Sequence, residues 1–158
     1  MKLYRITPEA YIENYSGLGA SYQDGARWNR PGQPVLYFAL DAATALLELG
    51  QYLPSPQLMP KHYRFAEYDI PDDTPLQIVS MDDLPYDWAA FPYPRSTQQM
   101  GGDWIESGHE LGLVVPSCAV PQGKGKSLVV NARHRDCNNI QLLSSTSDIY
   151  NPRLFSSV

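Results

Sequence analysis

The sequence is poor in cysteine and in charged residues, and it has no long hydrophobic run. Its two cysteines, Cys118 and Cys137, are too few for the disulfide framework of a small secreted protein. No stretch approaches the roughly 18 consecutive apolar residues of a membrane-spanning helix, and the start of the chain lacks the apolar segment of a signal peptide. We therefore expect a cytoplasmic protein that does not interact with a membrane.

Metal-ligand spacing and a basic surface are missing as well. The three histidines and two cysteines form neither a Cys-x-x-Cys nor a His-x-x-x-His unit, so we expect no metal site. The net charge is −5, and the basic residues are scattered apart from the short cluster Arg133, His134 and Arg135. Because direct binding to nucleic acid needs a basic surface, we expect none. A few local arginines are still enough to bind an anionic ligand.

Proline and tyrosine are abundant, with 14 and 11 copies in 158 residues. A chain of this length usually folds as one domain, and no linker or repeat divides it, so we expect a single domain over residues 1–158. The prolines exclude long uninterrupted helices and favour strands, turns and ordered loops. Residues 14–34, rich in Gly, Ser, Asn and Pro, are expected to form a long ordered loop, a kind of segment that often carries function.

Short apolar runs predict about six strands. The candidate runs are Leu3–Ile6, Val35–Leu40, Tyr63–Ile70, Leu76–Ser80, Leu111–Val115, Ser127–Asn131 and Ile140–Leu143. Many of the intervening segments are too short for the crossovers of a parallel sheet. The pattern therefore predicts an α+β domain with a mixed, largely antiparallel sheet.

Two segments have helical signals. Asp41 is the expected N-cap of a helix from Ala42 to about Leu53, which Pro54 and Pro56 would end. The apolar stripe of this helix consists of Ala42, Leu46, Leu49 and Leu53. A second helix is expected within residues 94–107, where two consecutive glycines weaken it.

Three polar residues are candidates for chemistry, although spacing alone assigns none of them. Glu48 projects away from the apolar stripe of the first helix, which favours a solvated glutamate. Arg27, beside an aromatic residue in the long loop, either packs on that ring or clamps a phosphate. Ser117 with His109 or His134 would suit a hydrolase, but no Gly-x-Ser-x-Gly elbow surrounds it, which favours a turn residue.

An ordered set of short motifs resembles the RES domain, a family named for an arginine, a glutamate and a serine. The motifs run from about residue 3 to residue 155, and it is their order and spacing that make them distinctive. They are Tyr4-Arg5-Ile6, Gly25-Ala26-Arg27-Trp28-Asn29-Arg30-Pro31-Gly32, Val35-Leu36-Tyr37-Phe38-Ala39, Ala45-Leu46-Leu47-Glu48, Leu84-Pro85, Trp88, Gly102-Asp103-Trp104, Val115-Pro116-Ser117 and Val130-Asn131-Ala132-Arg133-His134.

The resemblance implies a fold related to ADP-ribosyltransferases and a bacterial toxin that degrades NAD. Glu48, Arg27 and Ser117 are then the expected catalytic residues, and Arg5, Arg27, Tyr37 and Ser117 the expected substrate-binding residues. The two arginines suit the pyrophosphate, and Tyr37 suits stacking on nicotinamide. Glu48 would stabilise positive charge on the ribose as the C–N bond breaks. Ser117 would donate to the nicotinamide amide or a ribose hydroxyl.

Two positions depart from the family pattern. Ala26 stands where a second glycine is common, and Ala132 stands where the family has proline. The first departure narrows the conformational freedom of the loop, and the second affects the local turn. Neither removes an expected catalytic residue.

The resemblance also implies the reactants and a partner. NAD is the expected substrate, no cofactor is expected, and either water or inorganic phosphate accepts the ADP-ribose. The expected partner is an Xre-like helix-turn-helix antitoxin that blocks the active site in a hetero-oligomer and supplies the DNA binding. Transfer of ADP-ribose to a cellular protein stays open because it uses the same bond cleavage. A catalytically silent binding module and an unrelated hydrolase are the remaining alternatives.

Overall fold

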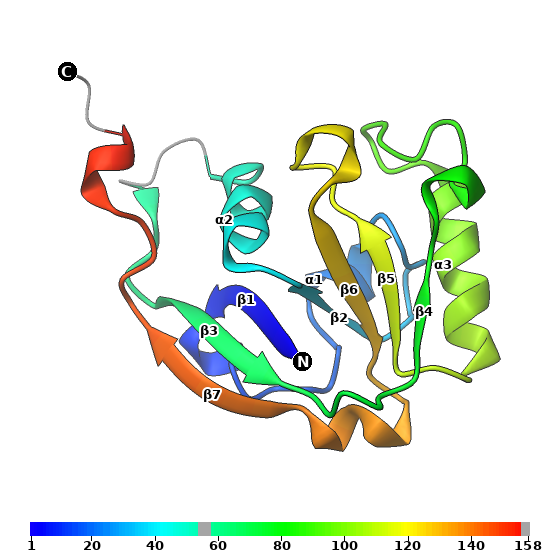
Figure 1. Cartoon of the computed structure of the whole chain (residues 1–158), viewed down its shortest axis with the longest axis horizontal. Coiled ribbons are helices and arrows are strands. Elements are labelled where there is room, and N and C mark those ends of the chain that lie inside the picture. Colours follow the sequence, from blue (N-terminus) through cyan, green and yellow to red (C-terminus); the bar gives the residue numbers. More distant parts are fainter. Residues whose placement is uncertain (54–57, 156–158) are drawn as a thin grey trace.

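A single sheet of seven strands organises the chain (Figure 1). The computed structural model describes residues 1–53 and 58–155, so Pro54 and Pro56 lie outside the described residues. The strand order is β4-β5-β6-β2-β1-β3-β7. The strands are β1 (Lys2–Pro8), β2 (Val35–Ala39), β3 (Tyr63–Asp69), β4 (Leu76–Ile78), β5 (Gly112–Pro116), β6 (Lys126–Asn131) and β7 (Gln141–Thr146).

The mixed, largely antiparallel sheet expected from the sequence is confirmed. All neighbouring strands are antiparallel except β4 and β5, which pair in parallel. Each of the seven apolar runs named from the sequence overlaps one of the seven strands of the described residues. The short turn between β5 and β6 makes that pair antiparallel, whereas the parallel pair β4 and β5 is joined by a long segment that contains α3.

The join between β1 and β2 divides the sheet into two halves. β1 pairs with β3 along its whole length, but it meets β2 only at Tyr4 and Ala39. Beyond that point the two strands separate, so β1-β3-β7 and β4-β5-β6-β2 diverge from each other (Figure 1). This divergence leaves an opening between β1 and β2.

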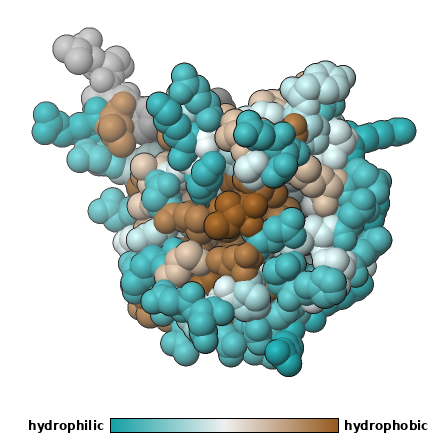
Figure 2. Space-filling view, turned by 45° about the vertical axis from the view of Figure 1, so that its right-hand side comes forward, coloured by the Kyte–Doolittle hydropathy of each residue, from teal (hydrophilic) through white to brown (hydrophobic). Residues whose placement is uncertain are grey.

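The two hydrophobic clusters lie on opposite faces of the part of the sheet formed by β2, β5 and β6, because their members alternate along these strands. One includes Leu3, Phe38, Tyr68 and Leu128, and the Tyr68 hydroxyl within it donates to the carbonyl of Ile12 at 2.9 Å. The other contains both buried tryptophans and packs beneath the helix α3 (Arg95–Ser107). Apolar side chains also reach the surface in the middle of one face, surrounded by hydrophilic ones (Figure 2).

Three α-helices complete the described part of the chain, and one of them was not expected. α2 (Ala42–Gly50) begins at Asp41 as predicted but ends earlier than Leu53, and α3 matches the segment expected within residues 94–107. α1 (Ala20–Asp24) lies inside the loop expected from 14 to 34. Short 3-10 helices are Glu9–Tyr11, Met81–Asp83, Pro121–Gly123, Arg135–Asn139 and Pro152–Phe155. Among the described residues, no helix is long and apolar enough to span a membrane.

The orientation of α2 corrects the expected apolar stripe. The buried residues of this helix are Thr44 and Ala45, whereas the members of the predicted stripe are only partly buried. Glu48 lies one turn after Thr44 and Ala45 and therefore shares their inward-facing side. The prediction was wrong because it assumed that a helix buries its most apolar side, whereas the side of α2 that carries Ala45 and Glu48 borders a pocket in the fold.

We expect Asp41→Ala to lower the free energy of unfolding by about 1 kcal/mol. The Asp41 carboxylate accepts from the backbone N–H of Thr44 at 2.8 Å and from its hydroxyl at 2.6 Å, and both contacts are lost in alanine. Urea unfolding followed by circular dichroism measures the change. Asp41→Asn should lose less, because its amide oxygen still accepts the backbone bond; an unchanged free energy of unfolding in Asp41→Ala would mean that the cap is unimportant.

Candidate active site

A pocket of about 930 Å³ opens where β1 and β2 separate. Residues of both strands line it, together with α2 and the long loop before β2. Its polar and aromatic members include Tyr4, Arg5, Tyr11, Arg27, Tyr37, Glu48, Gln51, Tyr52, Tyr63, Tyr93 and Cys118. Four of the five residues assigned by resemblance to the RES domain line this pocket, and the fifth, Ser117, lies directly behind one of them.

Glu48 is held through both of its carboxylate oxygens. The Ser117 hydroxyl donates to Oε1 at 2.6 Å, and the side-chain amide of Gln51 donates to Oε2 at 2.8 Å. Ser117 is only 1% exposed and accepts from the backbone N–H of Ala119 at 3.1 Å. The partners of Ser117 are therefore protein groups, and its hydroxyl orients Glu48.

The turn between β5 and β6 brings Ser117 close to α2. The Ser117 N–H donates to the carbonyl of Gly125 at 2.9 Å, and Gly125 itself packs against α2. A Cβ on Gly125 would lie 2.6 Å from the Thr44 hydroxyl oxygen and would overlap the side chain of Val120. Glycine at this position lets the turn approach the helix closely enough for the serine to reach Glu48.

Arg27 lies at the pocket with part of its guanidinium already bound. Nη1 donates to the carbonyl oxygens of Trp88 at 2.5 Å and Ala90 at 2.8 Å. The guanidinium carbon lies 5.1 Å from the centroid of the Tyr93 ring, within cation–π range. Its other N–H groups have no acceptor among residues 1–53 and 58–155, so they remain available to an anionic ligand.

Arg5 is the second cation of the pocket and lacks a carboxylate partner in the described part of the chain. Its Nη1 is buried without a hydrogen-bond partner, and its guanidinium carbon lies 5.8 Å from the centroid of the Phe38 ring. Burial lowers the pKa of Arg5 below its ordinary value. A buried unpaired donor is costly, so this position favours a negatively charged ligand.

Tyr37 is fixed by its hydroxyl to the long loop. The hydroxyl donates to the side-chain oxygen of Asn29 at 2.8 Å and accepts from the backbone N–H of Trp28 at 3.2 Å. Burial raises the pKa of Tyr37 well above its ordinary value, so the phenol stays protonated. The ring lines the pocket while its polar end holds the residue that follows Arg27.

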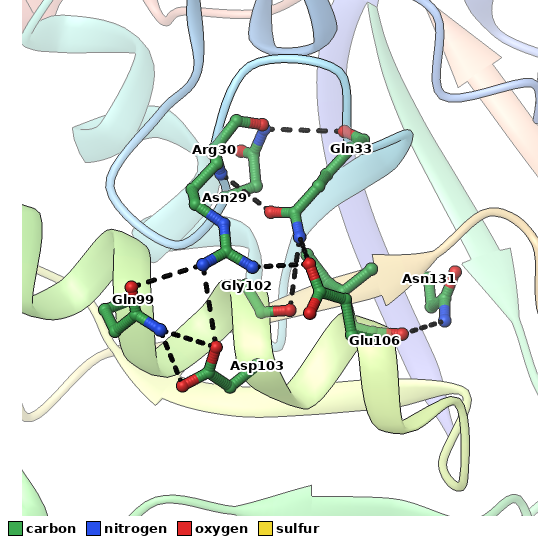
Figure 3. A network of polar contacts seen from close by, with 9 residues as sticks. Asn29, Arg30, Gln33, Gln99, Gly102, Asp103, Glu106 and Asn131 are labelled. Carbon is green, nitrogen blue, oxygen red and sulfur yellow. Dashed lines mark hydrogen bonds and ion pairs between the residues drawn. The ribbon is translucent and has the colours of Figure 1, made fainter.

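A polar network anchors the long loop to α3 (Figure 3). Arg30 donates to Glu106 at 2.5 Å, and Gln33 donates to the carbonyl of Gly102 at 3.1 Å. Near the start of the same helix, Gln98 donates to the carbonyl of Ala26 at 3.1 Å. The position of Arg27 therefore depends on a helix that is distant in sequence and contributes no residue to the pocket wall.

The histidines expected in the hydrolase alternative are not partners of Ser117. His109 is exposed, and His134 accepts from the backbone N–H of Asp136 at 3.2 Å. His134 lines a separate, smaller pocket of about 460 Å³. Within the described ranges, no group of three or more His, Cys, Asp or Glu residues is arranged to hold a metal ion.

The two departures from the family pattern have local explanations. Among the described non-glycine residues only Gln122 has a positive φ, so Ala26 does not require a glycine conformation. The N–H of Ala132 donates to the carbonyl of Pro34 at 3.2 Å, a bond that proline cannot make. This bond fastens the end of β6 to the start of β2.

Some site residues could not be assigned from the sequence. Gln51 and Tyr52 were visible only as polar neighbours of Glu48 on the helix, and Tyr93 had no signal beyond being aromatic. The carbonyl groups that bind Arg27 have no sequence signal at all, because every residue carries one. These contacts depend on the path of the segment before α3.

We expect Gly101→Ala to lower the free energy of unfolding by about 1–3 kcal/mol. A Cβ on Gly101 would overlap the carbonyl oxygen of Trp28, so the loop that carries Arg27 must shift. Gly50→Ala is the matched control, since a Cβ there meets nothing within 4 Å, and it should leave stability unchanged or slightly raised. Urea unfolding compares the two; equal effects would disprove the close approach of loop and helix.

Comparison with known proteins identifies the family to which the chain is similar. The family model described as the RES domain matches residues 2–149. A protein named Toxin Res from Photorhabdus laumondii is 35% identical over 147 residues, covering 90% of this chain and 92% of the relative. Another Toxin Res, from Yersinia enterocolitica, is 31% identical and covers 98% and 99%. A protein named Prs ADP-ribosylating toxin from Sphingobium is also 31% identical and covers 96% and 94%.

A solved structure shares the fold. It is the M. tuberculosis MbcT-MbcA toxin-antitoxin complex, in which one chain superposes with a TM-score of 0.70 at 24% identity, covering 92% of this chain and 82% of that one. The α+β fold with a mixed, largely antiparallel sheet, expected from the sequence, is therefore shared with a chain of that complex. Family model and curated relatives span nearly the whole sequence, and the chain therefore belongs to the RES-domain family.

Proposed function

We propose that this chain is a toxin that cleaves the nicotinamide–ribose bond of NAD. The observation that carries the proposal is the Glu48 carboxylate, held by Ser117 and Gln51 beside a pocket that also contains Arg5 and Arg27. The names of its relatives support the class of activity, since two are called Toxin Res and a third is called an ADP-ribosylating toxin.

The two arginines fit the charge of the substrate. NAD carries a pyrophosphate with two negative charges, and guanidinium groups bind phosphate oxygens through several N–H donors. Arg5 supplies a buried donor without a protein partner, and Arg27 supplies the donors that Trp88 and Ala90 leave unused. Together they would hold the pyrophosphate while the nicotinamide ribose lies near Glu48.

Bond cleavage requires an anion more than it requires an acid. When the C1′–N bond breaks, its electron pair moves to the nicotinamide ring and neutralises the ring charge, while the ribose becomes an oxocarbenium ion. A fixed carboxylate beside the ribose stabilises that positive charge. Water then adds to C1′ through its oxygen and releases one proton, which yields ADP-ribose. Inorganic phosphate in place of water adds through one of its oxygens and yields ADP-ribose phosphorylated at that carbon.

The structure gives Ser117 a different role from direct contact with NAD. Its buried hydroxyl donates to Glu48, so we assign it the orientation of the carboxylate in place of the expected bond to nicotinamide or ribose. Tyr37 keeps a ring surface on the pocket for the nicotinamide, while its hydroxyl fixes the loop beside Arg27. Both residues thereby place the two charged groups that act on the substrate.

Transfer of ADP-ribose to a protein is the second candidate, favoured by the name of the Sphingobium relative. It shares the cleavage step and differs in the acceptor. Incubation with NAD alone separates the two activities. Free nicotinamide and ADP-ribose, or its phosphorylated form when phosphate is added, support cleavage; release that depends on a cell extract, with label incorporated into a protein band, supports transfer.

An antitoxin is the partner that this function requires. A chain that depletes NAD must be held inactive in its own cytoplasm, and the neighbour of known structure is a toxin-antitoxin complex. We propose an Xre-like helix-turn-helix protein that covers the pocket in a hetero-oligomer. The net charge of −5 disfavours direct contact of this chain with DNA, so we assign the DNA binding to the partner. Co-expression with the product of the adjacent gene should restore growth and retain both chains through purification.

Glu48→Gln should reduce the turnover of NAD by about 10²–10³-fold with little change in KM. The substitution keeps the size of the side chain and its place on α2 but removes the negative charge. Nicotinamide release measured over a range of NAD concentrations gives both constants. Glu13→Gln, an exposed change outside the pocket, is the matched control and should behave as the original protein. Wild-type turnover in folded Glu48→Gln would remove Glu48 from the mechanism.

Arg27→Ala should weaken NAD binding at least about tenfold, because a charge-assisted contact to phosphate is lost. Isothermal titration into the folded variant measures the affinity, and thermal melting monitors release of the segment that Arg27 holds through Trp88 and Ala90. Arg135→Ala, whose side chain is 90% exposed, is the control. Undiminished affinity for NAD in Arg27→Ala would assign the pyrophosphate to other donors.

A further inference from the structure

Two tyrosines join opposite sides of the pocket. Tyr52 follows α2 directly after Gln51, and Tyr93 belongs to the segment before α3. Their hydroxyl oxygens lie 2.8 Å apart, so one donates to the other, and both side chains line the pocket. We call this pair the tyrosine bridge.

The tyrosine bridge connects the groups that hold the two charged residues of the site. On one side, Tyr52 adjoins Gln51, which donates to Glu48 at 2.8 Å. On the other, the Tyr93 ring lies 5.1 Å from the Arg27 guanidinium carbon. A single hydroxyl contact thus spans the gap between the helix that carries Glu48 and the residues that surround Arg27.

The hydroxyl contact between Tyr52 and Tyr93 is formed although Tyr52 lies at the exposed edge of the pocket. Tyr52 is 67% exposed, yet its hydroxyl is directed to Tyr93. Desolvation and then the bond to Tyr93 raise the pKa of Tyr52 above its ordinary value, so the Tyr52 phenol stays protonated at neutral pH and keeps the contact there. A hydrogen bond between neutral groups is worth a several-fold factor in an equilibrium or a rate.

We propose that Tyr52 and Tyr93 are positioning residues, whose hydroxyl contact sets the separation of Glu48 and Arg27 for cleavage of NAD. The inference rests on the proposed function. Cleavage needs the carboxylate beside the ribose while the guanidinium holds the pyrophosphate, and small displacements of such groups are costly in rate. The last residue of α2, Gly50, lies nine residues after the N-cap Asp41, so the tyrosine bridge restrains the end of the helix nearest Glu48.

The test is a double-mutant cycle on the two hydroxyls. Tyr52→Phe and Tyr93→Phe each keep the ring and remove one partner of the same bond. Each should lower kcat for nicotinamide release about 2- to 10-fold with KM for NAD nearly unchanged. The double variant Tyr52→Phe/Tyr93→Phe should lose no more than either single variant, because one contact is broken in all three. Tyr86→Phe, at a fully exposed tyrosine, is the control and should match the original protein.

The outcomes separate this inference from the function on which it rests. Additive losses in the double variant would mean that each hydroxyl acts independently, and a change confined to KM would mean direct contact with the substrate; either overturns the positioning role. Unchanged kcat in the single variants, or lower melting temperatures without a change in kcat, also overturns it. An original protein that releases no nicotinamide in the same assay refutes the proposed function itself, and the inference with it.

Discussion

The site depends on the separation of β1 from β2. These strands pair at one position, Tyr4 and Ala39, and then diverge, while β1 stays paired with β3 and β2 with β6. Continuous pairing would place their side chains too close together to leave a pocket. The opening puts Arg5 from one strand and Tyr37 from the other at a common cavity, and α2 and the long loop add Glu48 and Arg27 at its edge.

The second constraint is that the charged groups are held by residues distant in sequence. Ser117 reaches Glu48 from the end of β5, and the loop with Arg27 is anchored on α3 through Arg30 and Gln33. Side chains fixed in this way need little rearrangement when charge develops on a substrate, which is the condition for electrostatic catalysis. Gly101 and Gly102 of α3 also help to position Arg27, because the absence of a side chain lets the loop lie directly on the helix.

The polar side of α2 shows how a functional surface alters a folding rule. An amphipathic helix normally turns its apolar side inward, and that rule placed Glu48 in solvent. Here Ala45, Glu48 and Leu49 border a pocket that arginine and tyrosine side chains also line, and the buried residues of the helix are Thr44 and Ala45. Two donors, Ser117 and Gln51, fix the direction of the half-buried Glu48 carboxylate.

The sequence by itself determined the strands, the limits of α3, the N-cap of α2 and the family, because apolar runs, Asp41 and ordered motifs are local signals. It also identified Arg5, Arg27, Tyr37, Glu48 and Ser117 as a set, through resemblance to the RES domain. Only the tertiary structure decided that Ser117 contacts Glu48, that Trp88 and Ala90 bind Arg27 through carbonyl groups, and that Tyr52 meets Tyr93. The reason is physical: each of these contacts joins segments whose distance is set by the divergence of the sheet and by the path of the chain across it, and no local pattern of residues encodes that distance.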